Sequence, residues 1–111
     1  MKLYIKFVLA ASMMLANLAA ATEALQAGTI KNLSYRGGYV TFNVIGDGGV
    51  NYCESCPTDP GSRGNKACWI EEGKQVQISI LLSAQARGKK IYGRVPEFVS
   101  NCSIYQMTVE N

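Results

Sequence analysis

The sequence predicts a small α+β domain that is mostly β and stapled by disulfides, with the element order β-β-β-α-β-β, in which one short strand is optional. Three observations lead to this fold class. Residues 39–45 (YVTFNVI) alternate in polarity and are rich in β-branched and aromatic side chains, as in a half-buried strand. A helix-forming segment over about residues 75–87 ends before Gly88. Four cysteines, an even number, occur in a chain of only 111 residues.

Residues 1–21 have the three-part layout of a bacterial-type secretory signal. Lys2 and Lys6 give a positive start, an apolar run (FVLAASMML) follows, and three alanines precede the expected cut before Thr22. The alternative is a membrane anchor, but the apolar run is shorter than the roughly 20 residues that span a bilayer. We therefore expect residues 1–21 to be cleaved, and residues 22–111 to form one domain that is secreted or periplasmic and has no membrane span.

The next elements in order are a hairpin and a long loop. Residues 27–35 alternate loosely, and together with 39–45 they predict a β-hairpin. Gly37 and Gly38 lie between the two runs and can adopt the positive φ of a tight turn. Residues 46–66 are a loop by composition, since they hold five glycines and two prolines.

The second half of the chain contains the helix between short strands. Residues 67–71 (ACWIE) are expected to be a strand that carries the only tryptophan. The helix over about 75–87 follows. Val76, Ile78 and Ile80 alternate as in a strand, but Ile78, Leu81, Leu82 and Gln85 fit a helical stripe, and one helix is favoured. Residues 90–95 are the next strand, which a proline ends, and 103–109 are the last strand.

Composition excludes several classes of function. Cleavage of the signal would remove two of the eleven Lys and Arg residues, which leaves nine basic against eight acidic residues. The positive electrostatic potential of such a domain is too weak to indicate nucleic-acid binding. The chain has no histidine, which excludes Ser-His-Asp and Cys-His catalysis and zinc sites with an imidazole ligand. Glu71 and Glu72 are adjacent, so on a strand they would point to opposite faces and could not form an acid/base pair. We expect no enzymatic activity, no cofactor and no metal.

The four cysteines, Cys53, Cys56, Cys68 and Cys102, are expected to form two structural disulfides. A redox CxxC usually lies at a helix N-terminus in a βαβ unit, whereas a proline and a glycine-rich loop follow Cys56 here. A four-thiolate zinc site usually has two closely spaced pairs, but Cys68 and Cys102 are far apart in the chain. In an oxidising compartment, free thiolates would also be converted to disulfides.

The pairing of these cysteines stays open between two alternatives. A disulfide between two cysteines that only two residues separate is more typical of thiol–disulfide exchange than of a structural cross-link. Cys53 and Cys56 should therefore each pair outside the CxxC motif. Cys56–Cys68 with Cys53–Cys102 is favoured, and Cys53–Cys68 with Cys56–Cys102 is the close alternative. Loop-entropy arguments assign roughly 3 and 4 kcal/mol to the shorter and the longer closure.

Candidate binding residues lie at the predicted hairpin turn. Tyrosine, with an apolar ring and a polar tip, suits sugar faces and protein interfaces. Tyr35 and Tyr39 flank the turn that begins with Arg36, and these three residues are the candidate binding set. The alternative interpretation is that both are ordinary half-buried tyrosines.

Three short motifs carry a resemblance to a known family. They are a Cys-aromatic strand at 67–70 (ACWI), a Leu-Leu-x-Ala-like run at 81–84 (LLSA), and a Gly-Lys turn at 88–90 (GKK). Together these motifs resemble the B subunits of pertussis-like bacterial toxins, in particular those of subtilase cytotoxin and typhoid toxin. The resemblance covers about residues 25–95.

The resemblance implies a five-stranded OB-fold barrel with one helix. It also implies a homo-oligomer, a ring of five subunits, that binds sialylated cell-surface glycans and carries an enzymatic A subunit. In that family a segment ahead of the first strand helps form the sugar pocket, and here that segment would fall inside the expected signal. We therefore carry two hypotheses: an exported, non-catalytic, glycan-binding module, and a small envelope protein with a structural or inhibitory role and no glycan ligand.

Overall fold

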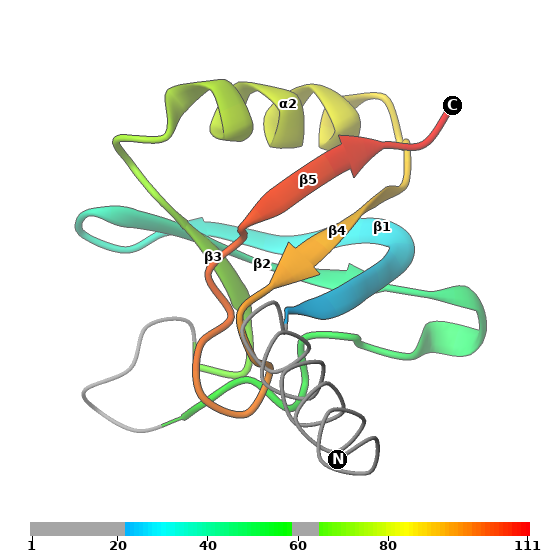
Figure 1. The fold of residues 1–111 in the computed structure, drawn as a ribbon. Coiled ribbons are helices and arrows are strands. Elements are labelled where there is room, and N and C mark those ends of the chain that lie inside the picture. The colour runs from blue at the N-terminus through cyan, green and yellow to red at the C-terminus, as the bar shows by residue number, and fades with distance from the viewer. Residues whose placement is uncertain (1–21, 59–64) are drawn as a thin grey trace, which may run out of the picture.

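The computed structural model describes residues 22–58 and 65–111 (Figure 1). The predicted signal lies outside the described residues, as does part of the predicted loop. The elements in chain order are β1 (Glu23–Tyr35), β2 (Tyr39–Ile45), the short 3-10 helix η1 (Asp47–Gly49), β3 (Cys68–Glu71), α2 (Gln75–Ala86), β4 (Ile91–Val95) and β5 (Gln106–Val109). The predicted order of five strands and one helix is therefore confirmed.

The strands form one antiparallel sheet in the order β3-β2-β1-β4-β5. β1 is central because it is long enough to pair with two strands, first with β4 and then with β2. Its register shifts between Leu25 and Gly28 and again between Lys31 and Ser34. Such irregularities bend a strand, which allows β1 to serve both halves of the sheet. This pairing also explains why β1 begins at Glu23, ahead of the predicted residue 27.

The sheet is not closed, so the predicted barrel describes it only loosely. Its edge strands β3 and β5 do not pair along their length, and Ser103 forms an isolated parallel bridge to Trp69. The Trp69 N–H donates to the Cys102 carbonyl at 3.2 Å, and the Ile104 N–H donates to the Trp69 carbonyl at 2.9 Å. Residues 103–105 take part in this local contact, and the regular strand β5 begins only at Gln106.

The glycines predicted at the hairpin turn and at the end of the helix have the expected backbone angles. Gly37 and Gly38 have φ of 45° and 110°, and the Arg36 N–H beside them donates to the Tyr39 carbonyl at 2.8 Å. Gly88 has φ of 65° immediately after α2. These left-handed conformations are ones that glycine adopts without steric penalty.

The core lies between the sheet and α2, which contacts β1 and β5 along one side of the molecule (Figure 1). The largest fully buried side chains are Phe42, Leu25, Ile70, Leu81, Ile91, Ile104, Val44 and Val95. No helix within the described residues is both long and apolar enough to cross a membrane.

β2 is buried on both faces, which the half-buried strand pattern did not predict. Thr41 is 4% exposed and Asn43 is 9% exposed, although both alternate with the core residues Phe42 and Val44. The Asn43 side chain is buried because it is hydrogen-bonded: its amide donates to the Lys66 carbonyl at 3.0 Å and its oxygen accepts from Asn32 at 2.9 Å.

Both cysteines of the CxxC motif pair outside it, as predicted, but the favoured pairing is wrong. The bonds are Cys53–Cys68 and Cys56–Cys102, which is the alternative that the sequence left open. They close separations of 15 and 46 residues. None of the described cysteines is free.

The backbone around the loop explains this pairing. The Tyr52 N–H donates to the Val44 carbonyl at 2.9 Å, so the chain after η1 returns along the end of β2. β3 pairs with the same strand, and Cys53 is thereby set beside Cys68. The Cys56 N–H then donates to the Cys53 carbonyl at 3.1 Å, and this turn directs Cys56 toward Cys102.

Candidate binding site on the outer face of the sheet

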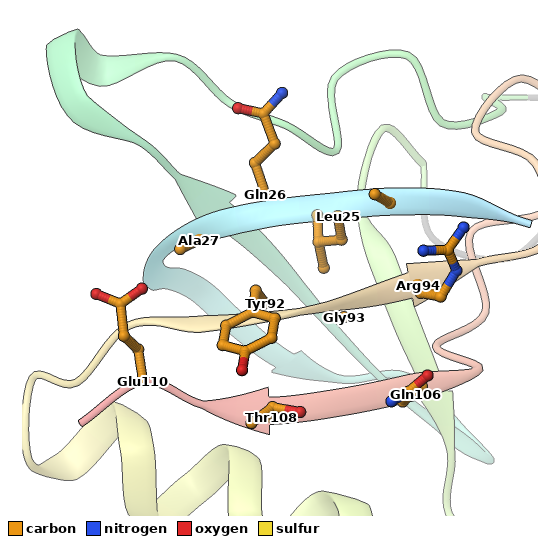
Figure 2. A pocket seen from close by; sticks show the side chains of 10 residues that line it. Leu25, Gln26, Ala27, Tyr92, Gly93, Arg94, Gln106, Thr108 and Glu110 are labelled. Carbon is orange, nitrogen blue, oxygen red and sulfur yellow. The ribbon is translucent and has the colours of Figure 1, made fainter.

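A hollow of about 510 Å³ lies on the solvent-facing side of β1, β4 and β5. Its lining residues are Ala24, Leu25, Gln26, Ala27, Tyr92, Gly93, Arg94, Gln106, Thr108 and Glu110 (Figure 2). The set contains an aromatic ring, a guanidinium, two amides, a hydroxyl and a carboxylate. It is therefore richer in hydrogen-bonding groups than an ordinary apolar cleft.

Strand alternation and register gather these side chains. On β4, Ile91 and Val95 are buried, and Tyr92 and Arg94 lie between them on the opposite face. Arg94 is paired with Ala24 of β1 and with Gln106 of β5, so one row crosses three strands. Tyr92 is paired with Thr108 in the neighbouring row.

The Tyr92 ring lies in the middle of the hollow, and Arg94 and Glu110 lie at its opposite ends (Figure 2). Tyr92 is 43% exposed, so a large part of its ring is accessible to a ligand. The carboxylate and the guanidinium give the two ends opposite formal charges. A ligand across the ring would therefore meet an aromatic platform with a cation on one side and an anion on the other.

Arg94 is held in place by Thr22, the residue before β1. Its Nε donates to the Thr22 hydroxyl at 2.6 Å, and a terminal nitrogen donates to the Thr22 carbonyl at 2.9 Å. These bonds restrict the rotamers of a long side chain before any ligand arrives, which lowers the entropy lost on binding. The remaining guanidinium N–H groups are the donors that a ligand could use.

Gly93 has no side chain, so backbone atoms form the floor of the hollow at this position. A methyl group at Gly93 would lie 1.9 Å from the Gln106 carbonyl oxygen and 3.1 Å from the Met107 Cα. Only glycine permits this approach of β5 to β4, and the approach sets Gln106 and Thr108 beside Tyr92.

The binding residues predicted from the sequence lie elsewhere, at the turn between β1 and β2. Tyr35 is 64% exposed, and Arg36 is exposed beside it. Tyr39 is half-buried and packs edge-on against Trp69, with ring centroids 6.0 Å apart. None of these three predicted residues lines the hollow on the outer face.

A second, smaller hollow of about 260 Å³ lies beside the contact between β3 and residues 101–104. It is lined by Trp69, Ile70, Glu71, Lys74, Asn101, Ser103 and Ile104. It presents mainly the edge of the open sheet, and no ring there is exposed to the extent that Tyr92 is.

The Tyr35 hydroxyl at the hairpin turn donates to the Glu72 carboxylate at 2.5 Å and accepts from the Gly38 N–H at 3.2 Å. The bond to Glu72 raises the pKa of Tyr35 above its usual value, and the bond from Gly38 opposes this effect more weakly. We predict that Glu72→Ala lowers the pKa of Tyr35 back toward its usual value, because the variant removes the acceptor that raises it. Glu54→Ala, in a different loop, should leave it unchanged. NMR titration of the Tyr35 ring carbon is the measurement.

The sign of the stability effect follows from the same shift. A raised pKa means that the folded state favours the neutral phenol. The stabilisation of the folded state by the Tyr35–Glu72 hydrogen bond is therefore complete below the pKa of the unfolded state, near 10. It is lost as the pH rises through the higher folded pKa. An unchanged Tyr35 titration in the Glu72 variant would show that the hydrogen bond does not persist in solution.

The sequence reasoning missed the hollow around Tyr92, although one signal was available. Residues 90–95 were predicted to be a strand, and the alternation of side chains along a strand places Tyr92 and Arg94 on one face. Their partners on β1 and β5 depend on strand register, which the local pattern does not specify.

Comparisons with protein-family models, with curated proteins and with solved structures find no match. The resemblance to toxin B subunits stays a prediction from the sequence.

Proposed function

We propose that the chain is an exported, non-catalytic binding domain that holds a saccharide against Tyr92. The observation that carries this proposal is the accessible Tyr92 ring amid hydrogen-bonding side chains from three strands. A sugar ring has an apolar C–H face that stacks on an aromatic ring, and hydroxyls at its edge that bond to amides, hydroxyls and guanidinium groups.

The resemblance to toxin B subunits supports the same class of ligand, a cell-surface glycan. Sialylated glycans, which that resemblance implies, carry a carboxylate. Arg94 at one end of the hollow is the group that would receive it, because guanidinium–carboxylate hydrogen bonds are charge-assisted. Glu110 at the other end would repel the same carboxylate, so the acidic group of the glycan should lie toward Arg94.

Export is supported by the cross-links and by the layout of residues 1–21. Two disulfides suit a secreted or periplasmic location, because reducing compartments keep thiols free. By the resemblance, the domain would act as a homo-oligomer, a pentamer, that carries an A subunit. Light scattering of the mature chain should then report a mass several times that of the monomer.

The test is a glycan array followed by titration calorimetry on the glycan that binds most tightly. Tyr92→Ala should raise its Kd about fivefold, since a lost aromatic contact is worth about 1 kcal/mol. Tyr105→Ala is the matched control: Tyr105 is 65% exposed and precedes β5, but it does not line the hollow. Tyr35→Ala separates this site from the hairpin turn.

Three results would contradict the proposal or assign the ligand to another part of the surface. Equal loss in the Tyr92 and Tyr105 variants would mean that the hollow has no special role. Loss in the Tyr35 variant alone would place the ligand at the hairpin turn. A monomer that retains no glycan would instead favour the small envelope protein with a structural or inhibitory role, whose partner a pull-down from envelope extracts should identify.

A further inference from the structure

The two disulfides belong to one compact sulfur cluster. The Sγ atoms of Cys53, Cys56 and Cys68 all lie within 4.8 Å of one another, and Cys102 is bonded to Cys56. The four side chains are between 0% and 2% exposed. Four sulfur atoms are therefore gathered in a closed, buried space.

The fold also supplies the second close pair that the sequence lacks. Cys53 and Cys56 have the C-x2-C spacing of thiolate pairs in structural zinc sites. The parallel bridge from Trp69 to Ser103 then sets Cys68 and Cys102 in neighbouring positions, one residue before each bridge partner. The chain separation that argued against zinc is removed by this contact between β3 and the segment ahead of β5.

We propose that, when both disulfides are reduced, these four cysteines bind one Zn²⁺ ion in a closed tetrahedral site. Zn–S bonds are about 2.3 Å long, which sets the sulfurs of a tetrahedron roughly 3.8 Å apart. That separation is within the 4.8 Å over which three of the sulfurs already lie. Cys102 lies outside that group of three and adjoins it through its bond to Cys56, so on reduction each bonded pair would open to the tetrahedral spacing and the Cys102 side chain would turn toward the other three.

The chemistry balances with a dithiol as the reductant. Each disulfide takes up two electrons and two protons, and each reductant dithiol becomes a disulfide. The four cysteine thiols then lose their protons to solvent as four S–Zn bonds form. Oxidation reverses both steps and expels the metal, so the chain would be cross-linked by zinc in a reducing compartment and by disulfides after export.

The test uses the full mature chain, reduced with a dithiol that is then removed under anaerobic conditions. Co²⁺ should bind at one equivalent and show thiolate-to-metal charge transfer with tetrahedral d–d bands, and Zn²⁺ should displace it. The oxidised chain should show neither signal. A reduced chain that gives no such bands, or that saturates at a different stoichiometry, would overturn the proposal.

Variants and a folding readout make the result decisive. Cys102→Ser should weaken Zn²⁺ binding at least about 100-fold, beyond the effect of losing an outer-shell partner. Ser55→Ala, within the CxxC motif, should bind Zn²⁺ like the unmodified chain. If reduction unfolds the domain, Zn²⁺ should restore its near-ultraviolet circular dichroism, and failure to do so would also refute the site. Because no glycan takes part, these outcomes are independent of the proposed sugar site.

Discussion

Replacing Cys56 and Cys102 together by alanine should lower the free energy of unfolding by about 4 kcal/mol. The bond between them spans 46 residues and ties the loop after β2 to the segment before β5. Without it the unfolded chain gains the entropy of a long open loop. Small domains have only about 5–15 kcal/mol of stability in total, so this variant should be close to unfolding at body temperature. Denaturant unfolding of the oxidised proteins is the measurement.

The other disulfide provides the matched control for that prediction. Cys53 and Cys68 are 15 residues apart, and their double alanine variant should lose only about 3 kcal/mol. Both variants remove buried sulfur atoms, so the comparison isolates the length of the closed loop. Equal losses, or a larger loss for the shorter loop, would show that loop entropy does not decide the stability of this domain.

Gly93→Ala should lower the free energy of unfolding by about 3 kcal/mol, the upper end of the range for overpacking. The added methyl would lie 1.9 Å from the backbone oxygen of Gln106, and backbone cannot move aside as a flexible side chain can. The expected response is separation of β5 from β4. Thermal unfolding should measure the loss, and faster hydrogen exchange in β5 should locate it.

Gly73→Ala is the control for steric space. A methyl group at Gly73 would meet nothing within 4 Å, and this glycine needs no left-handed backbone. Its stability should change by less than about 1 kcal/mol. If Gly93→Ala were equally mild, the close approach that forms the floor of the hollow would not exist in solution. If it is severe, it should also weaken binding at the proposed saccharide site, because Gln106 and Thr108 would move away from Tyr92.

Residues near one another in the chain were sufficient to predict the local elements. The helix predicted over about residues 75–87 is α2 (Gln75–Ala86), and the hairpin strand predicted at 39–45 is β2 with the same bounds. Gly37, Gly38 and Gly88 were expected to supply positive φ, and they do. These features depend on side-chain periodicity and on backbone preferences that act over a few residues.

Long-range contacts decided the cysteine pairing and the position of the candidate site. The return of Tyr52 along β2 selects Cys68 as the partner of Cys53, and no local preference of the loop residues specifies that return. Register likewise sets Gln106 and Thr108 beside Arg94 and Tyr92. A shift of one residue would turn those side chains to the other face without changing the polarity pattern of either strand.

The sequence by itself therefore determined the class of fold, the order of the elements and the participation of the cysteines in disulfides. The tertiary structure alone decided which cysteines are joined, that the sheet stays open between β3 and β5, and that Tyr92 lies in a hollow lined by residues from three strands. The physical reason is the range of the interactions. Hydrophobic periodicity and glycine angles act between near neighbours, whereas strand register and disulfide partners depend on residues brought together only when the whole chain folds.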